Sequence, residues 1–517
     1  MELDQEYSAE ELRHSKPLDR NLISHHPEVK TFLKDFQQVH FPKYNKARRA
    51  MLNVLLMDLY VTWYYDPERF IGFHRSVTAY SKGTRYNKLR ITRTIILVLD
   101  DLIDAGFVFQ HKGFQGHTSS FISRIKATSA LEEIFEPVSF DALDIHNHEG
   151  RETIIMKDLV IKKTADGKEI KTKPEIDYED TNHTIAMRKD TEALNKLLQR
   201  THVDLGNRYH QYIERKKGKN QKRGSRISIT QHNKFVYRVF NNNDWTHGGR
   251  YYGGFWQQIS KEDRTHLRLN GERTIEVDYS GIHIMLLYCR KNINYSGADP
   301  YRIHIPEINN PDASRWLAKQ VLLTAVNAKD VRTTCAAVRR KIIKETPEEL
   351  ELSIPSHLSY TDSFVTFIID KLKELHPDIS EFLCTGAGIE LQNADSEIAT
   401  KIINDFVKDD VPILPVHDSF VVQEDYAPDL REAMRVAFQD VGQVAVTGFT
   451  DDDYSIRNAG VGLKQEGYLD ELYDHYEPDG GAEHQQMLTM KDKYQPATPP
   501  HKARYRHFKA WLDKTDE

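Results

Sequence analysis

The sequence predicts an α/β (α+β) protein of several domains, and three observations support this class. Between residues 91 and 128 a helix, a glycine, a strand, a loop and a second strand follow one another. Further along, two apolar strands carry Asp278 and Asp418, and a helix over residues 315–328 separates them in the chain. With 517 residues, 39% hydrophobic and 29% charged, the chain is long enough for about two to four domains with hydrophobic cores.

The N-terminal part is expected to form a small module behind a polar arm. Residues 1–45 are polar and predict an irregular arm, and residues 46–140 hold the module. Apolar spacing predicts helices over 47–65 and 91–105, and Gly106 ends the second helix before a strand begins. The order helix, strand, loop and strand resembles a winged helix, with residues 111–120 as the wing. Its basic residues could face a phosphate backbone, or could be solubilising charges or a protein contact; they are Arg85, Lys88, Arg90, Arg93, Lys112, Arg124 and Lys126.

Residues 141–234 are expected to form a linker and a thumb-like helical region. Asp166-Gly167 predicts a hairpin turn, and residues 186–203 predict an amphipathic helix. Residues 215–226 hold seven Arg or Lys in twelve positions. Such a run is often only a solvated segment, but its place before an aromatic-rich core favours contact with nucleic-acid phosphates. The side chains assigned to that contact are Lys216, Lys217 and Arg223.

The central chemical signal is the pair of aspartates. Asp278 follows the apolar run Thr274–Val277, and Asp418 lies in the apolar run 413–422. Carboxylates bind hard divalent cations, and a pair of them can hold the two ions used in phosphoryl transfer. The pair therefore predicts a site for two Mg²⁺ ions, with Mn²⁺ as a possible substitute.

The helix between the aspartates carries the second signal. Arg315 and Lys319 stand four residues apart, so both project from one face of that helix. A triphosphate presents several negative charges over a similar length, and Arg and Lys are the cations that bind phosphates. The alternative is a solvated basic edge.

Three segments of this core, in this order, resemble motifs A, B and C of family A DNA polymerases and the related phage-type single-subunit RNA polymerases: Asp278-Tyr279-Ser280-Gly281-Ile282-His283, Arg315-x-x-Ala318-Lys319 and Val416-His417-Asp418-Ser419-Phe420. Two further segments resemble family features, namely Gly248-Gly249-Arg250-Tyr251-Tyr252 ahead of motif A and Gln392-Asn393-Ala394-Asp395 ahead of motif C. The resemblance covers residues 235–425. It implies a right-hand polymerase core, with palm and fingers over residues 235–475.

The resemblance also implies a role for each matching residue. Asp278, Asp418 and the backbone carbonyl of Tyr279 would hold the metal ions. Lys319 would contact the incoming phosphates and act in catalysis, and Arg315 would clamp the outer phosphates. His283 and Asn327 would lie at the nucleotide, whereas the nucleic acid would be contacted by Arg250, Gln392, Asn393 and His417.

Three departures from the family pattern concern the choice of sugar. His283 stands five residues after Asp278, where the DNA enzymes have a Glu that excludes a ribose hydroxyl. Asn327 stands eight residues after Lys319, where most relatives have Tyr, and Ala328 replaces the following Gly. These changes imply an altered sugar gate, and the sequence His-Asp-Ser at motif C is closer to the RNA-polymerase branch.

Other features of the sequence bear on further classes of enzyme and on the cellular location. We find no proofreading-nuclease pattern, no Walker A loop and no Ser/His/Asp signature. Three cysteines without metal-ligand spacing indicate reduced thiols and a cytoplasmic protein, and no signal peptide or membrane-spanning run is expected. The net charge of −6 neither supports nor excludes nucleic-acid binding. Residues 476–517 predict a flexible tail that ends in a basic-aromatic helix over 504–512.

The sequence thus predicts an enzyme that extends a nucleic-acid 3′ end on a template, using nucleoside triphosphates and Mg²⁺. DNA synthesis is favoured slightly over RNA or primer synthesis, because the Arg-x-x-Ala-Lys and Asp-Tyr-Ser-Gly motifs are closer to the DNA enzymes. An alternative from another class is a replication-initiator DNA-binding protein with reduced catalysis. Template-independent tailing is a third option, suggested only by the missing Tyr.

Overall fold

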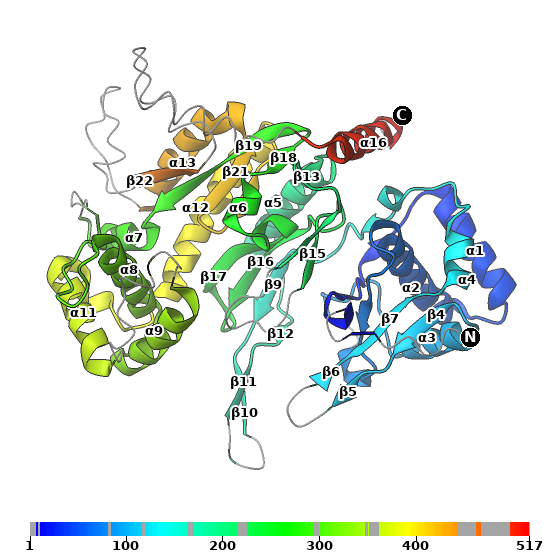
Figure 1. The fold of residues 1–517 in the computed structure, drawn as a ribbon, viewed down its shortest axis with the longest axis horizontal. Helices are drawn as coiled ribbons and strands as arrows, with labels where there is room; N and C mark the ends of the chain where they lie inside the picture. Colours follow the sequence, from blue (N-terminus) through cyan, green and yellow to red (C-terminus); the bar gives the residue numbers. More distant parts are fainter. Residues whose placement is uncertain are drawn as a thin grey trace.

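The fold is that of a computed structural model, which describes residues 7–8, 11–80, 84–115, 120–163, 167, 169–215, 225–293, 295, 299–346, 350, 361–442, 462–466 and 497–515. It is a mixed α/β protein, and the described residues contain two large hydrophobic clusters and one small one. The N-terminal cluster and the larger central cluster lie in two separate bodies (Figure 1).

The N-terminal body packs four helices around a small sheet with strand order β1-β3-β7-β4. Strand β7 pairs antiparallel with both β3 and β4, and α3 precedes β4, in agreement with the predicted helix, strand, loop and strand. Its elements are η1 (Glu11–Arg13), β1 (Lys16–Pro17), β2 (Leu22–Ile23), α1 (Pro27–His40), α2 (Lys46–Tyr65), β3 (Ile71–Phe73), η2 (Val77–Ala79), α3 (Thr94–Asp104), β4 (Val108–His111), β5 (Phe114–Gln115), β6 (Ser120–Phe121), β7 (Ser123–Ala127), α4 (Ser129–Phe135) and η3 (Ala142–Asp144).

The prediction of an irregular arm over residues 1–45 is wrong for residues 27–40, which form α1. Helix α1 begins with Pro27 at its first turn, where proline is well tolerated, and buries Val29, Leu33 and Phe36 against the core. Most polar residues of α1 lie on its exposed face, and Gln37, at 6% exposure, is the exception.

Residues 146–228 link the two bodies and contribute to the second. This segment contains β8 (His146–Asn147), β9 (Ile154–Lys157), β10 (Val160–Lys163), β11 (Glu169–Thr172), β12 (Glu175–Ile176), α5 (Asn182–Gln199), β13 (Val203–Leu205), β14 (Tyr212–Glu214) and β15 (Arg226–Ser228). Strands β10 and β11 form a hairpin that projects from the body (Figure 1). Helix α5 packs on α12 and on the strands β9 and β16, so it covers a sheet and does not project as a thumb.

The central body holds two larger sheets among its described residues. One has the order β12-β9-β16-β17, and the other has the order β13-β18-β19-β21-β20 with β22 paired to β19. The boundary predicted at residue 234 is crossed, because β9 pairs in parallel with β16. Its further elements are β16 (Val236–Asn241), β17 (Asp244–Gly253), η4 (Phe255–Gln257), α6 (Lys261–Arg264), β18 (Leu267–Leu269), β19 (Glu272–Ser280), α7 (Ile282–Arg290), α8 (Pro311–Asn327), α9 (Val331–Glu345), α11 (Asp362–Leu375), η5 (Pro377–Phe382), α12 (Gly388–Lys408), β20 (Leu414–Val416), β21 (Ser419–Gln423), η6 (Glu424–Tyr426), α13 (Ala427–Gly442), β22 (Gly462–Glu466) and α16 (Pro499–Thr515).

Helices α8, α9 and α11 form a cluster at one side of the central body, and α12 runs between that cluster and the strands (Figure 1). The predicted helix over 315–328 is confirmed as α8, which starts after an Asn310 cap whose side chain accepts hydrogen bonds from two backbone N–H groups. None of the helices in the described ranges is long and apolar enough to cross a lipid bilayer.

Candidate active site

Strand pairing brings Asp278 and Asp418 side by side. Strands β19 and β21 are antiparallel with Asp278 opposite Ser419, and Asp418 is the residue before Ser419. The backbone N–H of Tyr279 donates to the carbonyl oxygen of Asp418 at 3.4 Å. Two residues that are 140 positions apart in sequence therefore adjoin one another in the sheet, as the sequence predicted.

The turn that holds Asp418 is tight. Val416 pairs with Ser419, so only His417 and Asp418 connect β20 to β21. His417 has φ of 61°, a left-handed conformation that few non-glycine residues adopt. The apolar run 413–422 is thus a hairpin with Asp418 in its turn, and not one strand that ends in an aspartate.

The carboxyl group of Asp278 lies in an environment that opposes its charge. Burial is the main cause, and the negative charges of Asp418 and Glu276 add to it; together they raise the pKa of Asp278 to about 7. The positive charges of Lys319 and Lys261 act in the opposite direction but do not outweigh these causes. Among the described residues, no side chain forms an ion pair or hydrogen bond with the carboxylate of Asp278 or Asp418.

These carboxylates have the chemistry of a divalent-cation site. Half-buried, adjacent carboxylates without a protein partner repel one another, and a hard cation bound between them would remove that repulsion. Glu276 is less suited to this role, because Arg264 binds both of its oxygens, at 2.8 and 3.0 Å, and the hydroxyl of Ser419 donates to it. Asp278 and Asp418 are therefore the residues that could hold a metal ion.

Tyr279 contributes only its backbone to this region. Its ring is buried, and its hydroxyl donates to the carbonyl oxygen of Met434 in α13. The backbone of Tyr279 lies beside Asp418, as described above, so its position is compatible with the expected carbonyl ligand.

Arg315 and Lys319 share a face of α8, as predicted from their spacing. The guanidinium carbon of Arg315 lies 5.4 Å and the ammonium of Lys319 5.7 Å from the centre of the Tyr301 ring. Arg315 also forms an ion pair with Asp299, whereas Lys319 is exposed and has no ion pair within the described part of the chain. Lys319 is thus the freer cation, and Tyr301, which sequence reasoning missed, is buried beneath both.

Arg250 and His283 are joined through Asp395. The Nε of Arg250 donates to both carboxylate oxygens of Asp395 at 3.0 Å, and the Nε2 of His283 lies 2.8 Å from the same carboxylate. Asp395 is only 3% exposed. Burial lowers the pKa of Arg250, but the hydrogen bond and the charge of Asp395 outweigh burial, with a smaller contribution from the charge of Asp418, so the pKa is raised overall.

The predicted site residues at the start of α12 and at the end of α8 also form hydrogen bonds within the protein. Asn393 donates from its amide nitrogen to the carbonyl oxygens of Trp245, at 3.1 Å, and Gly248, so it holds β17 to α12. Asn327 donates to the carbonyl oxygen of Leu323 at 2.7 Å. Gln392 reaches Asn327 at 3.4 Å. Asn393, one of the predicted nucleic-acid contacts, thus also links two elements of the fold.

His417 lies against Tyr252, with ring centres 5.6 Å apart and the rings nearly perpendicular. Its Nδ1 is buried without a hydrogen-bond partner among the described atoms, and burial lowers the pKa of His417. Trp256 and Gln257 both donate to the carbonyl oxygen of Pro415, which anchors the β20–β21 hairpin to η4.

Three of the predicted site residues, Lys216, Lys217 and Arg223, lie outside the described residues. Sequence reasoning missed Glu276, Tyr301 and Asp299 at the site. Glu276 could have been found, because residues two apart in a strand share a face and Asp278 is two positions later. No known protein-family model and no curated protein sequence matches this chain.

Proposed function

We propose that the protein is a template-directed nucleotidyltransferase that extends a nucleic-acid 3′ end by two-metal phosphoryl transfer. The observation that carries the proposal is the meeting of the partly buried Asp278 and Asp418, which have no ion pair within the described ranges, with the exposed ammonium of Lys319 on their side of α8. An ordinary structural pair of carboxylates would be expected to bind cationic side chains, as Glu276 does.

Under this proposal Asp278 and Asp418 would hold Mg²⁺, which lowers the pKa of the attacking hydroxyl and stabilises charge on the leaving oxygen. Lys319 would bind the incoming phosphates and supply a proton to the departing pyrophosphate. Arg315 would contact the outer phosphates after exchanging its contact with Asp299 for the ligand. These groups act by placement and positive charge, which supply most of the catalysis in phosphoryl transfer.

The nucleotide sugar would be sensed by His283, with Asn327 at the nascent base pair. His283 is held by a buried Asp395, so its ring has a fixed orientation. We favour a DNA polymerase with an altered sugar gate, and an RNA polymerase or primer-synthesising enzyme of the same fold as the alternative within this class.

A second candidate is a DNA-binding protein of replication initiation with reduced catalysis. The observation that favours it is that two predicted ligand-binding cations already have protein partners, Arg250 with Asp395 and Arg315 with Asp299. The free Lys319 and the unpaired aspartates favour the enzyme.

Primer extension tests these candidates. The purified chain would be given a primed template with deoxynucleotides or ribonucleotides, in Mg²⁺ or Mn²⁺, and an unprimed template and a single strand without complement in parallel. Template-dependent extension supports the proposal, and the nucleotide set that is used separates DNA from RNA synthesis. Binding of the primed template without incorporation under all conditions would contradict the enzyme and support the second candidate, whereas extension of the single strand alone would indicate template-independent tailing.

A further inference from the structure

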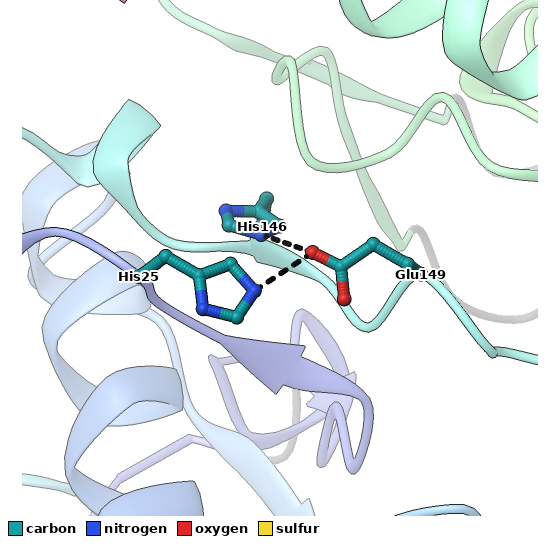
Figure 2. A group of neighbouring side chains, drawn as sticks. All are labelled: His25, His146 and Glu149. Carbon is teal, nitrogen blue, oxygen red and sulfur yellow. Dashed lines mark hydrogen bonds and ion pairs between the residues drawn. The ribbon is translucent and has the colours of Figure 1, made fainter.

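Two histidines and a glutamate meet on the N-terminal body, far along the chain from the aspartates. Figure 2 shows the rings of His25 and His146 directed at the carboxylate of Glu149. The Nε2 atoms lie 2.9 Å (His25) and 3.1 Å (His146) from the same oxygen, Oε1 of Glu149. All three ligand atoms lie within 4.8 Å of one another.

The backbone around this cluster is well fixed. Strand β2, just before His25, pairs antiparallel with β8, which carries His146, and Ile23 is opposite His146. Two further hydrogen bonds tie the β2 and β8 segments together. The Ser24 hydroxyl donates to the carbonyl oxygen of Asp144 at 2.6 Å, and the backbone N–H of His148 donates to the carbonyl oxygen of Asn21 at 2.7 Å. The backbone therefore keeps the three side chains within reach of one another.

We propose that His25, His146 and Glu149 form a binding site for a borderline divalent ion of the Zn²⁺ type. Two imidazole nitrogens and one carboxylate oxygen are a common protein ligand set for zinc, with a fourth position left for water. Zinc ligands at about 2.0–2.1 Å in a tetrahedron stand about 3.3 Å apart, so the 2.9 and 3.1 Å contacts need to open by only a few tenths of an ångström. The side chains of His25 and Glu149 are 65% and 57% exposed, so solvent reaches the open position.

This site differs in class from the aspartate pair. Mg²⁺ prefers oxygen ligands and keeps much of its water, so a site with two imidazoles selects against it. The bound ion would cross-link the start of α1 to the segment that leads from β8 into the central body, while its fourth position stays open to solvent. It is independent of the proposed nucleotidyl transfer.

Calorimetric titration of the untagged, chelator-treated full chain with Zn²⁺ tests the inference, with the visible absorption of bound Co²⁺ as a second readout. We expect one tight equivalent in the wild type, and a rise of roughly 2–4 °C in the melting temperature at saturation. Glu149→Gln keeps the shape of an exposed side chain and should weaken binding at least about tenfold, and His146→Asn should do so too.

Two variants serve as controls. His183→Asn alters an exposed histidine away from the cluster and should bind Zn²⁺ as the wild type does, and so should Asp418→Asn. Unchanged affinity in Glu149→Gln and His146→Asn, or loss of the tight equivalent only in Asp418→Asn, would overturn the assignment. Near-ultraviolet circular dichroism of each variant checks that it is folded.

Discussion

At the residue scale, the main feature is the carboxyl group of Asp278. This carboxyl holds its proton more tightly in the folded state than in the unfolded state. The free energy of unfolding of the protein therefore falls as the pH rises from about 4 to about 7. Functional sites often contain such groups, because an ion or substrate, and not the protein, supplies the missing partner.

Asp278→Asn should therefore stabilise the protein in metal-free buffer above pH 7. The amide has no charge to bury, so we expect a gain of about 1–2 kcal/mol in the free energy of unfolding at pH 8, measured by denaturant titration. At pH 5 the wild-type carboxyl is protonated, and the gain should be smaller. Asp425→Asn, at an exposed aspartate, is the matched control. A variant that is less stable than the wild type at pH 8 would show that Asp278 is stabilised by a partner.

A second prediction concerns His283 and the sugar. His283→Glu alone would place a carboxylate against buried Asp395 and should lower stability. In the double variant His283→Glu/Asp395→Asn the new carboxylate can pair with Arg250, which lies 3.1 Å from His283. We expect this double variant to shift the ratio of kcat/KM toward deoxynucleotides, with Asp395→Asn as the control. An unchanged ratio would mean that position 283 is not the sugar gate.

At the scale of elements, the two cationic side chains of helix α8, Arg315 and Lys319, differ in their ion pairing. Arg315 is paired with Asp299, and Lys319 is not paired within the described residues. The spacing in the sequence predicted their common face correctly. The spacing could not reveal that Arg315 forms an ion pair with Asp299, because Asp299 lies in a different segment of the chain.

Lys319→Ala should consequently impair nucleotide use more than Arg315→Ala. Loss of a charged hydrogen bond costs about 1.5–3 kcal/mol, so we expect kcat/KM for the nucleotide to fall about 10- to 150-fold. Lys329→Ala removes an exposed lysine just beyond α8 and is the matched control. Equal effects of Lys319→Ala and Lys329→Ala would argue against a role for α8 in phosphate binding.

The small N-terminal sheet illustrates what the sequence could and could not predict. The order of α3, β4 and β7 followed from periodicity and from Gly106, which adopts φ of 80° after the helix. Periodicity could not show which of the basic residues of this module already have acidic partners. Arg85 forms ion pairs with Asp177 and Asp180, and Lys126 with Glu68, and such long-range pairs leave no local pattern in the sequence.

At the scale of the whole molecule, α16 joins the two bodies. On one side, Asp204 of β13 accepts hydrogen bonds from His501, at 2.9 Å, and Arg504, at 2.8 Å. On the other side, Trp511 donates to Asp144 of the N-terminal body at 2.8 Å. A basic-aromatic helix near 504–512 was predicted, but its docking was not, because its partners lie about 300 to 370 residues earlier.

Asp204→Ala should release this helix. Asp204 is 1% exposed and is the buried partner of His501 and Arg504, so its loss should cost about 3–5 kcal/mol. Hydrogen exchange should show faster exchange of the α16 amides while α8 and α12 stay protected. Asp513→Ala, within α16 but without an assigned partner, should leave that pattern unchanged. Protection of α16 equal to that of the wild type in Asp204→Ala would contradict this view of the docking.

The central claim is that Asp278 and Asp418 act as one unit on shared metal ions, and a double-variant cycle of primer-extension rates tests it most directly. The account predicts that Asp278→Asn and Asp418→Asn each lose at least about three orders of magnitude, while retaining affinity for the primed template. The double variant should be no slower than the slower single variant, because residues that act together are not additive. A single variant with the wild-type rate, or losses that multiply in the double variant, would contradict the account.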